Sequence, residues 1–482
     1  MTTTDEQQPQ RAPKPQHGEI LELRTESLAF EGKAVARRED GYVIFIDGAL
    51  AGETVRVEIV KAKSKFAESK LREVITPSPD RRIPICEHFG TCGGCAIMHI
   101  NYQTQLDSKT QQVRELFERI GKIASPPVLP AIGNPEREYN YRNKMEFSFS
   151  DSRWLDEEEI AGGDVADRFA LGLHIRGRYD RVLDNRVCHI AHPLVTKVLE
   201  HTRAFAREHD LHAFDPDKMP DGILRFLVVR NSFHTGEMMI NFVTSRYDED
   251  LMILYASMLG KQLPEVTTLV NNISNRRAQV AVGEREVIIF GSGTITDHIG
   301  KPKYQISPNS FFQTNTPQAE LLYTIAEQAA DLRADDNLWD LYCGAGTISL
   351  FVAPKVKSVL GVEVVEAAIN DAHENARRNG ITNANFISGD LRTVLLQRDV
   401  ATKYGAPSVM IIDPPRSGMH ADVVREILEL APERISYISC NPATQARDIE
   451  LMSEQYEVTA LQPVDMFPQT WHIECVATLR RK

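Results

Sequence analysis

No apolar run in the sequence approaches the roughly 18 to 20 residues that a membrane-spanning helix needs. The start of the chain also lacks the features of a signal peptide and of a transit helix. Residues 1–17 are instead polar and rich in glutamine and proline, which predicts a disordered tail. We therefore expect a cytoplasmic protein that does not associate with membranes.

An excess of positive charge is also lacking. The net charge is −12, which disfavours non-specific binding to phosphate backbones. A nucleic-acid substrate is still possible, because such binding depends on local basic surfaces. Residues 56–82 carry eight basic side chains against four acidic ones, and this stretch is either such a surface or an ordinary solvated face. No segment indicates an obligate protein partner.

Cysteines number only seven and are unevenly spaced, which argues against a disulfide scaffold and for metal or thiol chemistry. Three of them lie within ten residues, with two glycines between the last two, and a fourth comes later: Cys86, Cys92, Cys95 and Cys188. Four thiolates suit either zinc or a [4Fe–4S] cluster, and His88 or His99 could complete a zinc site instead. The spacing indicates a metal without choosing between these.

The length exceeds that of a single hydrophobic core, so we expect several domains. Residues 18–76 contain short alternating strands that predict a small barrel of the OB type, and the segment resembles an RNA-binding TRAM domain. Residues 77–305 predict a β-rich central domain that carries the cysteines and binds RNA. In residues 306–482, strands alternate with helices, which predicts an α/β domain with a doubly wound, mostly parallel sheet.

The first strand of that sheet ends in the glycine-rich turn Asp340–Thr347, where the backbone can approach a ligand closely. Glu363 ends the second strand, where an acid can bind ribose hydroxyls. Asp390 follows the third strand and is placed to meet an adenine edge. Acids around a nucleoside, without a phosphate-binding loop, favour S-adenosylmethionine and hence a Rossmann-like methyltransferase.

A cysteine follows a later strand of the same domain. Residues 434–439 deliver Cys440 to a point where we expect a loop containing Pro442. A lone cysteine is more often a small core residue. Here, however, it comes after the glycine-rich turn and after the Asp413-Pro414-Pro415-Arg416 motif, whose prolines fix Asp413 beside the transferred methyl group. We therefore interpret Cys440 as a nucleophile.

Glu474 lies on a terminal strand and supplies a carboxylate. A thiol with a carboxylate suits methylation of an unactivated pyrimidine carbon: thiolate addition at C6 makes C5 of uracil enolate-like, and a base later removes the C5 proton. A salt-bridge partner at a strand edge is the plain alternative for Glu474. An amino-group methyltransferase would use the Asp-Pro-Pro motif and leave Cys440 idle. A non-catalytic RNA-binding iron–sulfur protein is a third interpretation.

Five segments together resemble the RumA/TrmA family of RNA uridine-5-methyltransferases: Phe311–Asn315, Asp340–Thr347, Asp413–Gly418, Ser439–Thr444 and His472–Glu474. With the TRAM-like start and the cysteines, the resemblance covers roughly residues 18–480 and is closest to the ribosomal-RNA branch. It implies methylation of C5 of a specific uridine in 23S ribosomal RNA, giving 5-methyluridine. Transfer RNA is the alternative substrate.

The resemblance also implies a role for each site residue. Cys440 is the nucleophile that forms the C6 adduct, and Glu474 is the base. Six residues would bind S-adenosylmethionine: Gln313, Tyr342, Thr347, Glu363, Asp390 and Asp413. Four cysteines would hold a [4Fe–4S] cluster: Cys86, Cys92, Cys95 and Cys188.

Overall fold

The computed structural model describes residues 13–29, 32–163 and 165–482. Most of the predicted disordered tail, residues 1–12, lies outside the described residues. The chain divides into two compact units. The first unit comprises residues 1–85, 95–108 and 469–471, and the second comprises residues 86–94, 109–468 and 472–482. No helix in the part of the chain that the structure describes is long and apolar enough to cross a membrane.

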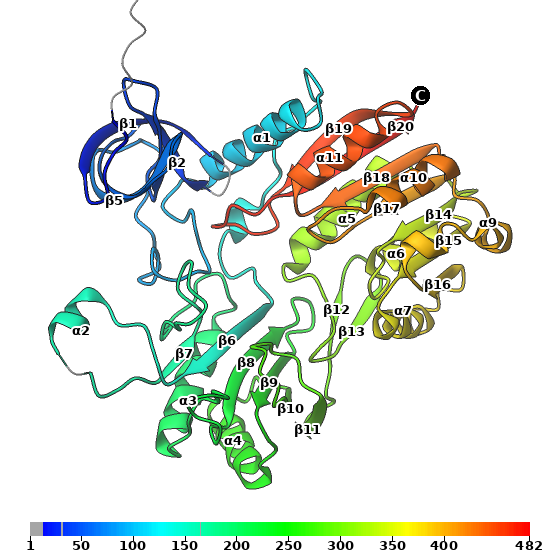
Figure 1. Ribbon diagram of the computed structural model, residues 1–482. Helices are drawn as coiled ribbons and strands as arrows, with labels where there is room; N and C mark the ends of the chain where they lie inside the picture. The colour runs from blue at the N-terminus through cyan, green and yellow to red at the C-terminus, as the bar shows by residue number, and fades with distance from the viewer. Residues whose placement is uncertain (1–12, 30–31, 164) are drawn as a thin grey trace, which may run out of the picture. The chain divides into compact units, whose positions relative to one another are not determined.

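The first unit contains a closed five-stranded barrel with strand order β1-β2-β3-β5-β4 (Figure 1). Its strands alternate buried and exposed residues, as a strand with one face on a core must. Ile44, Ile46, Val57 and Ile59 are completely buried in the centre of the barrel. The predicted barrel is therefore present, with these strands: β1 Ile20–Leu28, β2 Ala34–Arg37, β3 Val43–Asp47, β4 Thr54–Ala62 and β5 Phe66–Thr76.

The central part of the second unit is built on a six-stranded sheet with order β11-β10-β9-β8-β6-β7. Two helices, α3 (Leu194–Glu208) and α4 (Glu249–Gln262), pack their apolar faces on this sheet. A short hairpin, β12 (Ile295–His298) and β13 (Lys303–Ile306), follows. The strands are β6 Lys144–Ser150, β7 Ala170–Gly172, β8 Leu224–Asn231, β9 Met238–Thr244, β10 Thr268–Ile273 and β11 Arg285–Phe290.

The C-terminal part of the second unit is an α/β fold on a seven-stranded sheet with order β16-β15-β14-β17-β18-β20-β19. The first five of these strands are parallel to one another, whereas β20 is antiparallel to both β18 and β19. The mixed α/β fold class is thus as predicted. The strands are β14 Asn337–Leu341, β15 Ser358–Glu363, β16 Ala384–Ser388, β17 Val409–Ile412, β18 Arg434–Ser439, β19 Tyr456–Val464 and β20 Glu474–Arg481.

Helices cover this sheet (Figure 1). Their apolar side chains form two separate clusters with it. One cluster includes α5, α6 and α7. The other includes α8, α10, α11 and also α1, which inserts Val113 and Phe117. Their bounds are α1 Tyr102–Arg119, α5 Thr316–Ala330, α6 Thr347–Val352, α7 Glu366–Arg378, α8 Leu391–Val394, α9 Arg398–Tyr404, α10 Ala421–Leu430 and α11 Pro442–Met452.

Candidate active site

In the glycine-rich turn after β14, every second residue from 342 to 346 has a positive φ angle. Tyr342, Gly344 and Gly346 have φ of 66°, 53° and 75°. A Cβ on Gly346 would lie 2.9 Å from Cε1 of Phe386, so only glycine fits there. A Cβ on Gly344 would meet no atom within 4 Å, so this part of the turn faces open space. The turn therefore leaves room for a ligand beside its backbone.

Two carboxylates follow the neighbouring parallel strands. Glu363, at the end of β15, accepts hydrogen bonds from the backbone N–H of Gly344 (3.3 Å) and of Val365 (2.9 Å), which fixes its side chain against the glycine-rich turn. Asp390, after β16, caps α8 and pairs with Arg392, and the pKa of Asp390 is lowered to about 2 mainly by its hydrogen bond from that guanidinium. Both acids lie at the carboxyl edge of the sheet, where nucleoside ligands bind.

Gln313 and Thr347 meet at a residue that the sequence did not single out. The hydroxyl of Tyr323, on α5, lies 2.8 Å from Oγ1 of Thr347 and also forms a hydrogen bond with the side chain of Gln313. The backbone oxygen of Thr347 accepts a further hydrogen bond from the hydroxyl of Tyr304 (2.9 Å). Two buried tyrosines therefore hold the predicted cofactor residues in place.

Cys440 and Glu474 come from adjacent antiparallel strands. Ser439 at the end of β18 pairs with Cys475 on β20, so Cys440 follows one strand at the same end where Glu474 begins the other. Burial raises the pKa of the Cys440 thiol to about 11; the negative charges of Glu474 and Asp413 add to this, and the positive charge of Arg416 opposes it. The predicted nucleophile, base and motif aspartate thus interact electrostatically.

Our prediction of a loop containing Pro442 after Cys440 is wrong. Asn441 is instead the N-cap of α11, its side chain accepts the backbone N–H of Ala443 (3.2 Å), and Pro442 occupies the first turn of the helix. Proline is tolerated there because its nitrogen would have had no partner within the helix. Cys440 therefore lies at a strand-to-helix junction.

In this region, burial favours the neutral form of three acidic side chains. Burial raises the pKa of Asp413 to about 7 and the pKa of Asp340 to about 7. Burial also raises the pKa of Glu474, and the nearby charge of Asp413 raises it further. Asp340 accepts a hydrogen bond from Ser349 (2.5 Å) through one oxygen, whereas its other oxygen is buried with no partner. A cationic ligand would relieve this concentration of carboxylates.

His472, two residues before Glu474, is neutral near physiological pH. Burial lowers its pKa to about 4, and the positive charges of Arg416, Lys109 and Arg142 lower it further. A neutral imidazole can accept or donate a hydrogen bond, and it adds no positive charge near Glu474.

Three of the four predicted cluster cysteines are near one another in the second unit. Burial raises the pKa of Cys188 to about 11, and the charges of Cys92 and Cys86 contribute to the shift. The sulfur of Cys92 accepts the backbone N–H of Gly94 (3.4 Å). Cys95 belongs to the first unit. Within residues 13–29, 32–163 and 165–482, no three His, Cys, Asp or Glu side chains are grouped so that they could hold a metal ion.

Family models match two parts of the chain. The model described as tRNA (Uracil-5-)-methyltransferase matches residues 229–482, and that of the TRAM domain matches residues 14–71. The chain belongs to the tRNA (uracil-5-)-methyltransferase family. This membership confirms the predicted family, the TRAM domain and the expectation of an RNA methyltransferase.

Relatives of this methyltransferase match it over nearly the whole chain. An uncharacterized RNA methyltransferase of Chlorobaculum tepidum is 42% identical over 96% of this chain and 97% of its own length. Another, from Porphyromonas gingivalis, is 40% identical over 94% of this chain and 98% of its own. The crystal structure of Pyrococcus abyssi tRNA (uracil-54, C5)-methyltransferase in complex with S-adenosyl-L-homocysteine has a TM-score of 0.74 at 24% identity, and covers 95% of this chain and 100% of that one. The two proteins share a fold.

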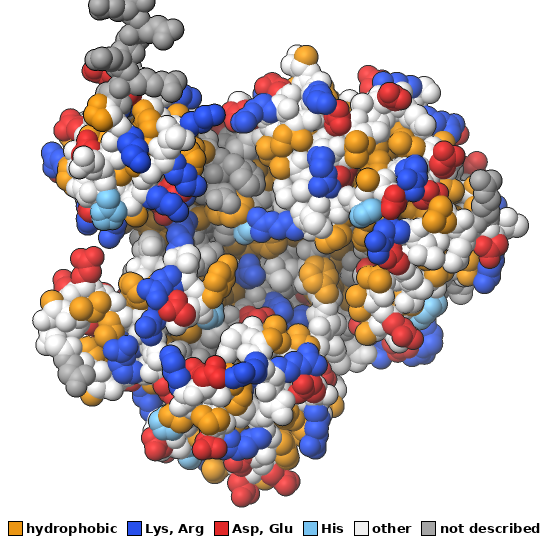
Figure 2. Space-filling view, viewed as in Figure 1, with side chains coloured by type: hydrophobic (Ala, Val, Ile, Leu, Met, Phe, Trp, Pro, Cys, Tyr) orange, Lys and Arg blue, Asp and Glu red, His pale blue; other side chains and the backbone are white. Residues whose placement is uncertain are grey.

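The basic stretch of the methyltransferase's barrel is partly neutralised by its own acids. Arg56 pairs with Glu73, and Arg72 pairs with Glu58. In Figure 2, acidic and basic side chains are interspersed on the visible face, without one continuous basic patch.

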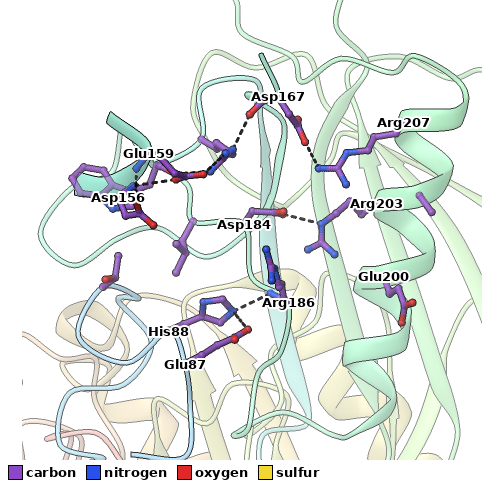
Figure 3. Close-up of a pocket in the computed structure, with 15 residues that line it drawn as sticks. Glu87, His88, Asp156, Glu159, Asp167, Asp184, Arg186, Glu200, Arg203 and Arg207 are labelled. Carbon is purple, nitrogen blue, oxygen red and sulfur yellow. Dashed lines mark hydrogen bonds and ion pairs between the residues drawn. The ribbon is translucent and has the colours of Figure 1, made fainter. Parts of the chain in front are cut away.

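A separate cavity of about 890 Å³ in the methyltransferase lies between the segment after β6, the turn before Cys188 and α3 (Figure 3). Its charged side chains largely pair with one another: Asp184 with Arg203 (2.8 Å) and Asp167 with Arg207 (2.7 Å). Among the described residues, His88, which the sequence offered as an alternative zinc ligand, lines this cavity, whereas the predicted catalytic residues, cofactor residues and cluster cysteines do not. Since its charges already have partners, the cavity does not by itself indicate a ligand.

Proposed function

We propose that the protein transfers a methyl group from S-adenosylmethionine to C5 of a specific uridine in RNA through a covalent bond between Cys440 and C6. The observation that carries this proposal is the placement of Cys440 and Glu474 at one end of the β18–β20 strand pair, with both side chains electrostatically coupled to Asp413. An amino-group methyltransferase has no use for such a thiol and carboxylate. Family membership supports the uracil-C5 chemistry.

The chain's own residues account for each change at the base. The Cys440 thiolate adds to C6 and breaks the C5–C6 double bond, which makes C5 a nucleophile. After C5 has taken the methyl group, Glu474 in its carboxylate form removes the C5 proton. The electrons of that C–H bond re-form the C5–C6 double bond and expel the thiolate. The thiol must lose its proton first, because burial favours its neutral form. Glu474 must itself have lost a proton beforehand, because burial raises its pKa.

The cofactor residues fit S-adenosylmethionine. When bound, that cofactor supplies an electrophilic methyl group on a positively charged sulfur. Asp340 has a buried oxygen without a partner, and the pKa values of Asp340 and Asp413 are about 7, because burial disfavours both charges. A cation would stabilise these carboxylates in their charged form. Glu363 and Asp390 would bind the nucleoside, and Gln313, Tyr342 and Thr347 would line the rest of the site.

We assign 23S ribosomal RNA as the substrate, in the cytoplasm, because the combination of a TRAM barrel with four cysteines resembles the ribosomal branch of the family. The central part of the chain, within residues 77–305, would contribute to RNA binding. The target uridine must be unpaired or flipped out, since a thiol cannot reach C6 inside a base stack. Transfer RNA is the alternative, and the names of the family model and of the Pyrococcus abyssi enzyme favour it.

The decisive experiment incubates the enzyme with S-adenosylmethionine and RNA that contains 5-fluorouridine. Fluorine at C5 cannot leave as a proton does, so the adduct should persist on a denaturing gel and map to Cys440 by mass spectrometry. Cys440→Ala should abolish it. Parallel reactions with 23S ribosomal RNA and with transfer RNA assign the substrate. If neither RNA gives an adduct while Cys440→Ala still methylates RNA, the proposed mechanism is wrong.

We further propose that Cys86, Cys92, Cys95 and Cys188 hold a [4Fe–4S] cluster. Four thiolates are the usual ligands of such a cluster, and Cys92 accepts N–H···S contacts from Gly94 (3.4 Å) and from the side chain of Asn185 (3.9 Å), as cluster sulfurs do. A zinc site completed by His88 is disfavoured, because Nε2 of His88 already accepts the backbone N–H of Arg186 (3.0 Å).

Iron and acid-labile sulfide should be found in anaerobically purified protein and be lost in Cys188→Ser. Cys475→Ser is the control, because Cys475 lies on β20.

A further inference from the structure

The loop between β19 and β20 has a buried anchor that the proposed mechanism does not use. Gln469 is completely buried and has φ of 68°, an unusual conformation for a residue other than glycine. Most hairpin loops contain about two to five residues, whereas this one runs from Asp465 to Ile473. A long loop with a strained, buried polar residue calls for a reason.

Hydrogen bonds from three segments of the first unit converge on Gln469. Its backbone oxygen accepts the N–H groups of Ala96 (2.9 Å) and Ile97 (3.1 Å). Its side-chain oxygen accepts from Arg82 (2.9 Å) and from Nε2 of Gln105 (3.1 Å). The backbone N–H of Gln469 in turn donates to Oε1 of Gln105 (3.1 Å). These reciprocal bonds fix both the backbone and the side chain of Gln469.

Gln105 is as completely buried as Gln469 and is itself held firmly. Its Nε2 also donates to the backbone oxygens of Ile97 (3.2 Å) and Ile100 (2.9 Å). Buried polar networks of this kind are rigid when every member is satisfied and costly when one member is removed. The two glutamines therefore form a stiff mount for the middle of the loop.

The loop leads from this mount directly to the proposed base, since Glu474 comes five residues after Gln469. Before the mount, Asp465 forms a buried ion pair with Lys109 (2.6 Å), and the oxygen of Pro468 accepts from Tyr141 (3.0 Å). After it, Ile473 is buried in the core of the second unit. The loop that leads to Glu474 is thus fixed both before and after Gln469.

We propose that Gln469 is a positioning residue for Glu474, acting through the loop that its bonds to Gln105 hold in place. This inference rests on the proposed function, in which Glu474 removes the C5 proton after Cys440 has added to C6. Cys440 lies between β18 and α11, and neither element is part of this loop. Release of the loop therefore impairs proton removal more than thiol addition.

The test compares those two steps in Gln469→Ala and in Gln105→Ala, which removes the partner without altering the loop. Adduct formation with 5-fluorouridine RNA reports thiol addition, and tritium release from RNA carrying 5-tritiated uridine reports proton removal. Tritium release should fall by about tenfold or more, because misplaced catalytic groups lose rate steeply. Adduct formation should stay within about twofold, and a methylated adduct should accumulate on ordinary uridine RNA.

Gln103→Ala is the matched control, since Gln103 is exposed on the same helix and its side chain donates to the neighbouring Asp107 (3.0 Å). Equal losses in both steps would show a merely structural role and overturn the proposal, as would no loss in either. If the unaltered enzyme forms no adduct at all, the proposed function fails instead. The results thus separate the two hypotheses.

Discussion

Ser439 lies opposite Cys475 in the antiparallel ladder between β18 and β20. This single register places Cys440 and Glu474 at the same end of two hydrogen-bonded strands, although they are far apart in sequence. A shift of the register by one residue would turn every side chain of β20 to the other face of the sheet. The register is held on the opposite edge too, because Val464 on β19 pairs with Glu474.

Adduct formation should accelerate with pH, because burial raises the pKa of the Cys440 thiol to about 11 and only the thiolate reacts. Between pH 7 and 9 the rate with 5-fluorouridine RNA is expected to rise by about tenfold per pH unit. Arg416→Gln removes a positive charge that lowers this pKa, so its rate at pH 8 should be about three- to tenfold lower. If the slower adduct formation of Arg416→Gln disappears at high pH, then the substitution acts by raising the pKa of the Cys440 thiol.

Arg425→Gln is the control for that measurement, because Arg425 is an exposed residue of α10 that pairs with Asp422 (3.0 Å). It should leave the pH profile unchanged. An Arg416→Gln profile that is lowered equally at every pH would show that Arg416 does not act through the thiol.

Asp340→Asn should make the cofactor-free protein more stable at high pH. The carboxyl of Asp340 has a pKa of about 7 when folded and an ordinary low value when unfolded, so the unfolded state loses its proton first as pH rises. The free energy of unfolding therefore falls between about pH 4 and pH 7, by up to about 4 kcal/mol for this group. Asparagine cannot ionise and should abolish that fall.

Urea denaturation at pH 4.5 and pH 8 measures this effect. The difference in unfolding free energy between Asp340→Asn and the unaltered protein should be larger at pH 8. Asp399→Asn, at an exposed position of α9, should show no such change. Equal differences at the two pH values would contradict the buried-acid explanation.

Gly361→Ala should destabilise the methyltransferase sheet by crowding. A Cβ there would lie 2.6 Å from Cδ1 of Phe386 and 2.8 Å from the sulfur of Cys343, inside a packed core. Overpacking of this kind costs about 1–3 kcal/mol. Thermal melting should show the loss, whereas Gly260→Ala should raise stability by about 0.5–1 kcal/mol, because it lies in α4 with nothing within 4 Å.

Lys109→Met should destabilise the protein by about 3–5 kcal/mol, because it leaves the charge of Asp465 buried without its partner. Adding Asp465→Leu should restore part of the loss. The exposed pair of Lys122 and Glu450 has the same separation (2.6 Å), yet Lys122→Met should cost less than about 1 kcal/mol. Chemical denaturation of the three variants and the unaltered protein distinguishes burial from mere pairing. Equal costs for the two lysine substitutions would refute this reasoning.

Local patterns were sufficient to predict the parallel part of the methyltransferase fold. The alternation of apolar strands with amphipathic helices around Asp340–Thr347 has a clear period, and the glycines of that turn serve a close backbone approach. The barrel was predictable for the same reason, because its strands alternate along Thr54–Ala62. Pro442 misled the prediction, although Asn-Pro is also a typical helix start.

Long-range pairings could not be predicted in this way. Nothing in the sequence near Tyr323 indicates that its hydroxyl contacts Thr347, since a tyrosine on the apolar face of α5 is an ordinary core residue. The same holds for Gln105 and Gln469, which are common polar residues in sequence and become buried partners only in the fold. Positive φ at Tyr342 and Gln469 also leaves no compositional signal.

The bonds between Gln105 and Gln469 have a consequence for biosynthesis. A ribosome completes Cys440 before Gln469 and Glu474, and at about 5–20 residues per second these follow within several seconds. Until then the amide of Gln105, made long before, lacks its two bonds to Gln469, although Ile97 and Ile100 can already accept from it. A chain with a nucleophile but no ordered base would stay tethered to any RNA that it attacked. Because the loop around Gln469 docks on a segment that is made much earlier, we expect the chain that leads into Glu474 to become ordered only after Gln469 has been synthesised and bonded to Gln105.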